Sequence, residues 1–172
     1  VLDLADCDRM VAVLKRLGIT EVNEHGMVDF GEEAPAHLTK IVRALGVPLH
    51  LDIHDYKVIC PRINLVDEAG MYCGEPDERA CNRCLESRGN SFGATDIGEW
   101  RKIHHQLLSQ ASAIVVPDED VAHRLRGYFP ELAYTVLPHD RELPGGPARP
   151  PHFGEDGLLH VVIIGAISRI KG

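Results

Sequence analysis

The sequence lacks long apolar runs, a secretory leader and an excess of basic residues. No segment approaches the roughly 18 consecutive apolar residues that suggest a membrane-spanning helix. The chain does not open with a basic stretch followed by an apolar one, as a secretory signal would. Lysine and arginine number 18 against 26 aspartate and glutamate residues, for a formal net charge of −8. Because this charge repels phosphates, we exclude nucleic acid as the main partner.

Internal repeats and low-complexity tracts are absent too, apart from one stretch at 139–157 that is rich in proline and glycine. The chain begins at Val1 without a methionine and ends at Gly172 directly after an apolar run, so we expect a fragment of a longer protein. Without a secretory leader, a cytoplasmic location is expected. In that reducing compartment clustered cysteines bind metal more often than they form disulfides.

Helical and strand-like segments alternate along the chain. Apolar residues at helical spacing predict helices over 5–18, 34–46, 96–111 and 118–129. Short apolar runs predict strands over 19–23, 47–55, 113–117, 133–138 and 159–167. This alternation predicts an α/β fold, a Rossmann-like parallel sheet with helices on both faces.

Polar residues follow the predicted strands. His25 comes after the first, His54 and Asp55 after the second, Asp118 after the third and His139 after the fourth. If the strands are parallel, these groups share the edge where open sheets bind ligands. Loops are polar in any case, and Asp118 also suits a helix cap. Asp55 either orients His54 or caps the next helix, and His54 suits proton transfer or a hydrogen bond to phosphate.

Four cysteines, Cys60, Cys73, Cys81 and Cys84, have the spacing C-x12-C-x7-C-x2-C. The terminal CxxC is the usual half of a tetrahedral zinc site, although the first two cysteines do not complete a standard ribbon. An iron–sulfur cluster, two disulfides or four free thiols are the alternatives. A nucleic-acid finger is disfavoured because acidic residues outnumber basic ones between Cys60 and Arg88. We expect a structural zinc that orders a segment with few large apolar residues.

Three stretches resemble one family. They are HDYKVICPR at 54–62 with the cysteines that follow it, QASAIVVPDEDVAHRLRGYFP at 110–130 with VLPHD at 136–140, and HVVIIGAISRIKG at 160–172. They are similar to the family-4 retaining glycosyltransferases of the two-domain B-type fold, in a bacterial branch with a cysteine cluster. The resemblance implies an acceptor-side Rossmann-like domain at 1–140, with a cysteine-rich metal-binding insertion at 60–92. It further implies an interdomain linker at 141–158 and the first strand and phosphate loop of a donor domain at 159–172.

The resemblance also implies residue roles. His54, with Asp55, takes the catalytic position that faces the sugar or phosphate of the donor. Gly165, Arg169 and Lys171 belong to the loop that grips the donor diphosphate, although Ala166 stands where the family has arginine. We expect His25, Arg62 and His139 to lie on the acceptor side of the site.

The implied activity is transfer of a sugar from a nucleotide-diphosphate donor to an acceptor hydroxyl, with retention at the anomeric carbon. This chain alone is expected not to turn over, because most of the donor domain is missing from it. The acceptor is a carbohydrate or a lipid-linked group, and the latter implies peripheral contact with the inner face of the membrane. The alternative from another class is a non-catalytic, zinc-stapled α/β binding domain.

Overall fold

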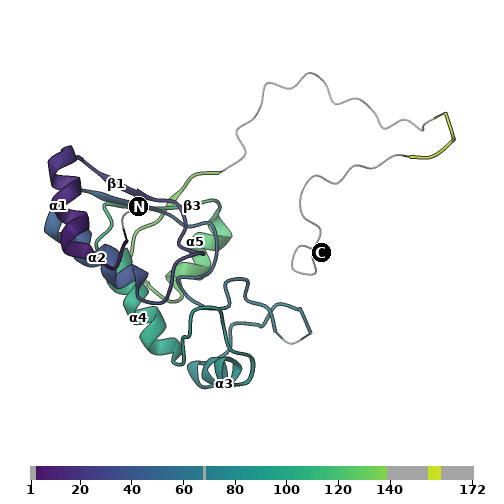
Figure 1. Cartoon of the computed structure of the whole chain (residues 1–172). Coiled ribbons are helices and arrows are strands. Elements are labelled where there is room, and N and C mark those ends of the chain that lie inside the picture. Colours follow the sequence, from purple (N-terminus) through teal and green to yellow (C-terminus); the bar gives the residue numbers. More distant parts are fainter. Residues whose placement is uncertain (1–2, 68, 139–154, 160–172) are drawn as a thin grey trace. The chain divides into compact units, whose positions relative to one another are not determined.

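The computed structural model describes residues 3–67, 69–138 and 155–159 (Figure 1). Two compact units divide the chain, Val1–Pro138 and His139–Gly172. The helices of the first unit are α1 (Cys7–Leu17), α2 (Ala34–Leu45), α3 (Glu78–Arg88), α4 (Ile97–Leu108) and α5 (Glu119–Arg126). Its strands are β1 (Val22–Glu24), β2 (Leu49–Asp52), β3 (Ala113–Val116) and β4 (Thr135–Val136). His139, Gly165, Arg169 and Lys171 lie outside the described residues, as do the linker and the predicted final strand apart from 155–159.

The four described strands form one parallel sheet in the order β1-β2-β3-β4. The predicted parallel α/β arrangement is therefore confirmed and is compatible with a Rossmann-like fold. Each strand pair is joined by a helical crossover, as parallel pairing requires. Parallel pairing also brings the carboxyl ends of all four strands to the same edge.

One face of the sheet carries the core, whereas helices were predicted on both faces. Side chains alternate along the central strands between buried and half-buried positions. The buried ones are Leu49, Leu51, Ile114 and Val116. They form one cluster with apolar side chains of α2, α4 and α5, and Figure 1 shows these three helices on the same side of the sheet. The reason is topological: the strand order never reverses, so right-handed crossovers all fall on one face.

The helix ends follow from local sequence. Gly18 and Gly46 end α1 and α2 with φ of 66° and 69°, a left-handed conformation that costs glycine little. Asp96 and Asp118 begin α4 and α5, where each carboxylate accepts a backbone N–H from three residues on, at Glu99 and Val121. Asp118 therefore acts as the helix cap that its position allowed.

The cysteine-rich segment contains a helix, α3, that its weak periodicity did not predict. Helix α3 packs on α4 through a second apolar cluster. Its buried members are Leu85, Ala94, Ile97 and Trp100. Asn82 ties the two helices together, since its side chain accepts the Ile97 N–H at 2.7 Å. Of these buried side chains only Leu85 belongs to the cysteine-rich segment, so the segment packs on α4, which supplies the large side chain, rather than building a core of its own.

Candidate functional site

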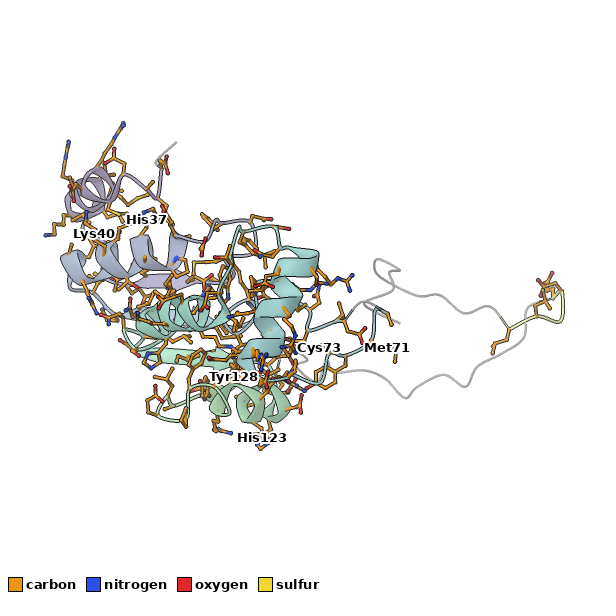
Figure 2. The ribbon with its side chains drawn as sticks, turned by 90° about the horizontal axis from the view of Figure 1, so that it is seen from below. His37, Lys40, Met71, Cys73, His123 and Tyr128 are labelled. Carbon is orange, nitrogen blue, oxygen red and sulfur yellow. The ribbon has the colours of Figure 1, made fainter. Side chains whose placement is uncertain are left out.

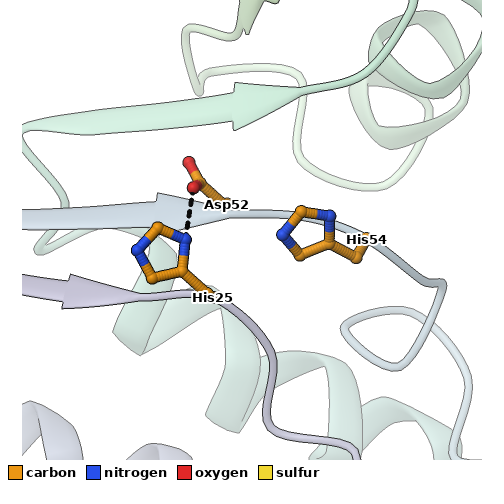
Figure 3. Close-up of side chains that lie close together, drawn as sticks. All are labelled: His25, Asp52 and His54. Carbon is orange, nitrogen blue, oxygen red and sulfur yellow. Dashed lines mark ion pairs between the residues drawn. The ribbon is translucent and has the colours of Figure 1, made fainter. Parts of the chain in front are cut away.

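Three side chains meet at the carboxyl ends of β1 and β2: His25, Asp52 and His54 (Figure 3). One ligand atom from each lies within 4.8 Å of those of the other two. His25 Nδ1 lies 2.6 Å from Asp52 Oδ2. The sheet register explains the meeting, because Glu24 pairs with Leu51 and the next residue of each strand is His25 or Asp52. His54 follows Asp52 by two residues, which places both on the same side of the extended chain.

The His25–Asp52 pair has a defined chemistry. When neutral, the imidazole donates Nδ1–H to the carboxylate, and this leaves Nε2 as a hydrogen-bond acceptor. The side chain of His25 is 67% exposed, so Nε2 is open to a ligand. Two imidazoles and one carboxylate are also a donor set that divalent transition metals accept. The group can therefore take a proton, accept a hydroxyl hydrogen bond or hold a metal ion.

Two further carboxylates lie at this edge. Glu24 accepts the Gly26 N–H at 2.5 Å, and burial raises the pKa of its carboxyl. Asp55 accepts the Lys57 N–H at 2.7 Å within the turn after β2, whereas the next helix, α3, is capped by Asp77. Glu24 and Asp55 line a cavity of about 30 Å³ together with Asp52 and His54.

Lys57 is buried beneath this edge and binds the loop that follows β1. Its ammonium donates to the carbonyls of Met27 and Phe30 and lies 3.8 Å from the centroid of the Phe92 ring. Burial lowers the pKa of this lysine. Lys57 also lines the small cavity, and the carboxylates of Asp55 and Glu24 oppose this effect of burial by favouring the charged ammonium.

A larger cavity of about 250 Å³ adjoins the edge on the β1 side. Glu24 and His25 contribute polar groups to its wall, and Met27, Phe30 and Leu38 contribute apolar ones. Phe30 is 47% exposed. A few polar groups beside an apolar surface are typical of pockets that bind small molecules.

His104 lines the smaller cavity from α4 and is neutral at physiological pH. Its side chain is 1% exposed, and Nδ1 lies 2.9 Å from the Trp100 carbonyl, which fixes the Nδ1–H tautomer. Burial lowers the pKa of His104 to about 4 from an unfolded value near 6.5. The unfolded chain therefore binds more protons than the folded one as the pH falls through this interval, and stability falls with it.

We expect His104 to contribute a loss of about 2 kcal/mol in unfolding free energy between pH 7 and pH 4.5. Urea unfolding at the two pH values measures the loss. Replacing His104 by leucine should remove that part of the pH dependence, whatever it does to stability at pH 7. Replacing the exposed His123 by leucine is the control and should leave the dependence unchanged. An equal dependence in wild type and His104→Leu would contradict the prediction.

The four cysteines lie around a different cavity, of about 210 Å³. Cys60 follows the turn after β2, Cys73 follows the short bridge between Val66 and Tyr72, and Cys81 and Cys84 lie on α3. Figure 2 shows Cys73 beside Met71, close to Tyr128 of the segment after α5. All are free thiols, and burial raises the pKa of Cys60, Cys73 and Cys81. Among the described residues, no three of these four sulfurs lie within 4.8 Å of one another.

The predicted site residues therefore separate into two places. His25, His54 and Asp55 meet at the strand ends, whereas Arg62 lines the cysteine cavity and does not line the cavities at the strand ends. Asp52 was missed, because it lies inside a segment predicted as a buried strand. The sequence did contain an indication of its role, because Asp52 is a carboxylate in a mostly apolar strand and stands two residues before a histidine.

His104 and Lys57 were missed as well. Each is a titratable residue that the tertiary structure buries beside the site. In the sequence, Lys57 stands before Val58 and Ile59 and His104 follows Ile103, and nothing there marks either residue as part of a site.

No helix in the described part of the chain is long and apolar enough to cross a membrane. Comparison of the chain with protein-family models, with curated proteins and with solved structures finds no match in any of the three.

Proposed function

We propose that this chain is the acceptor-side domain of a retaining glycosyltransferase. One observation carries the proposal: His25, Asp52 and His54 meet at the carboxyl edge of a parallel sheet. Ligands of open α/β sheets bind at that edge. The resemblance of HDYKVICPR to family-4 enzymes supports the same conclusion from the sequence, since His54 opens this motif.

The chemistry of the edge favours a ligand rich in hydroxyl groups. The carboxylates of Glu24, Asp52 and Asp55 accept hydrogen bonds and repel phosphates. The imidazoles of His25 and His54 add groups that accept or donate at neutral pH. A sugar ring offers several hydroxyls to such a surface and an apolar face to Phe30. We therefore assign this edge to sugar and acceptor, and the donor diphosphate to the loop with Arg169 and Lys171.

The proposed reaction breaks the bond between the anomeric carbon and the diphosphate oxygen and forms a bond to the acceptor oxygen. Positive charge develops on the sugar in the transition state, and the nearby carboxylate of Asp52 stabilises it. His54 hydrogen-bonds the transferred sugar. His25, held by Asp52, accepts the proton of the acceptor hydroxyl at Nε2. The nucleoside diphosphate leaves with the electron pair of the broken bond.

The test is nucleoside diphosphate release by the full-length protein. Uridine-, guanosine- and adenosine-diphosphate sugars would each be offered with and without a panel of sugar and lipid-linked acceptors. We expect release that requires both substrates, and a product whose anomeric configuration, measured by NMR, matches that of the donor.

Absence of release, combined with NMR line broadening when free sugars are added, would overturn the proposal. It would favour the non-catalytic binding domain instead. An inverted anomeric centre would overturn the assignment to a retaining enzyme.

A further inference from the structure

We propose that Cys60, Cys73, Cys81 and Cys84 bind one structural Zn²⁺ as four thiolates, and that the neighbouring arginines neutralise the resulting charge. The sugar-transfer proposal makes no use of these cysteines, so this inference is independent of it. All four side chains line the same cavity of about 210 Å³, although three separate segments of the chain supply them.

Backbone hydrogen bonds hold each of the three segments. The Cys60 N–H donates to the Tyr56 carbonyl at 2.9 Å, and the Cys73 N–H donates to the Leu65 carbonyl at 2.8 Å. Cys81 and Cys84 are three residues apart on α3, which places them on one face of that helix. The protein fold itself therefore holds the backbone of all four cysteines at the cavity.

Side-chain contacts fix the segments to the rest of the fold. Glu75, two residues after Cys73, forms an ion pair with Arg124 of α5 and accepts a hydrogen bond from the Tyr128 hydroxyl at 2.7 Å. On the other side, the Asn82 amide donates to Asp96 at the start of α4 at 2.9 Å. Turning a cysteine from one staggered rotamer to another moves its sulfur by about 3 Å. No three of the four sulfurs lie within 4.8 Å of one another, so binding requires such rotations toward a common centre with Zn–S bonds of about 2.3 Å.

Charge is the second, independent argument. Four thiolates around Zn²⁺ carry a net charge of −2, which a partly apolar cavity tolerates only with counter-charges nearby. Arg62 and Arg88 line the same cavity, and the buried Nε of Arg62 has no hydrogen-bond partner. Arg101 Nη2 lies 3.8 Å from Cys81 Sγ, and its side chain is 14% exposed. Asp67, which also lines the cavity, uses its carboxylate to accept the N–H groups of Ala69 and Met71.

Around four neutral thiols, Arg62 and Arg88 would have only the Asp67 carboxylate as an anionic group in the cavity lining, whereas Arg101 also pairs with Glu78 outside it. Around a tetrathiolate zinc the three guanidinium groups balance its charge and hydrogen-bond its sulfurs, as outer partners of metal ligands do. Because protein thiolates occupy all four positions, the metal has no open site for water or substrate. Its role is therefore structural: it joins the Cys60 turn, the Cys73 segment and α3.

The experiment measures metal in the 172-residue chain purified without chelator. We expect about one zinc per chain by mass spectrometry of the elements, with four thiols that become reactive only after the zinc is removed. Replacing zinc by Co²⁺ should give the near-ultraviolet charge-transfer absorption of thiolate ligands. The matched variants are Cys84→Ser, expected to lose the zinc, and Cys7→Ser, expected to keep it, since Cys7 is buried on α1 away from the cavity.

Arg62→Gln tests the role of the arginines. We expect about a tenfold loss of zinc affinity, measured by competition with a chromophoric chelator, with an unchanged circular dichroism spectrum of the zinc-loaded protein. An affinity equal to wild type would overturn the charge argument. Chain without metal and with reactive thiols, disulfides detected by mass, or iron in place of zinc would each overturn the site itself. These results come from wild-type protein, so misfolding of a cysteine variant cannot obscure them.

Discussion

Replacement of His54 by alanine is expected to lower turnover by the full-length protein by about 100-fold, the lower end of what a positioned acid–base or hydrogen-bonding histidine contributes. His54 lines the small cavity at the strand ends beside Asp52 and Lys57, so its loss removes a polar group from the place assigned to the sugar. The measurement is the steady-state rate of nucleoside diphosphate release at saturating donor and acceptor. Chemical unfolding of the variant should match that of wild type, because His54 is exposed.

His50→Ala is the matched control. His50 lies within β2, four residues before His54, whereas His54 follows the carboxyl end of that strand by two residues. We expect turnover within about twofold of wild type for this variant, since the half-buried His50 lies away from the proposed site. Equal turnover in His54→Ala and His50→Ala would remove His54 from the reaction.

Replacement of Trp100 by alanine is expected to lower the unfolding free energy by about 4 kcal/mol. Trp100 is 1% exposed and lies at the centre of the cluster that joins α3 to α4. Its indole Nε1–H donates to the Lys57 carbonyl at 2.6 Å, and its ring packs on Phe92 and His104. The substitution therefore opens a cavity and leaves a buried carbonyl without its donor. Urea unfolding at pH 7 measures the loss.

Trp100→Phe separates these two contributions. Phenylalanine keeps most of the ring volume but has no N–H, so we expect a smaller loss of about 2 kcal/mol. In the alanine variant, backbone amides of α3 should also exchange hydrogen faster, because α3 has lost its main packing partner. A loss below about 1 kcal/mol for Trp100→Ala would contradict the central place of this side chain.

Local sequence was sufficient for most of the secondary structure. The helices at α1 and α2 end at Gly18 and Gly46, as predicted, because glycine adopts the left-handed conformation at low cost. Four of the five predicted strands fall within the described residues and are present, although shorter than predicted. Their alternation with helices correctly indicated a parallel sheet, since parallel strands need long crossovers.

Local sequence was not sufficient for α3 or for the faces of the sheet. Helix α3 has few apolar residues of its own, and its stability depends on Trp100, which lies on the next helix. Helices on both faces were predicted from the fold class alone. In the described part of the chain, the strand order β1-β2-β3-β4 places the crossover helices on one face. Strand order depends on long-range pairing, which local sequence does not specify.

In the candidate site, too, some features could be predicted from local sequence and others depend on the tertiary structure. His25, His54 and Asp55 could be named from the sequence because polar residues after apolar strands point to the edge of a parallel sheet. The contact between His25 and Asp52 could not, because it depends on the register that pairs Glu24 with Leu51. Likewise, CxxC spacing suggested a metal site, but only the fold brings Arg62, Arg88 and Arg101 to it. Spacing along the chain specifies which residues can share a turn or a helix face, whereas contacts between distant segments depend on packing and register.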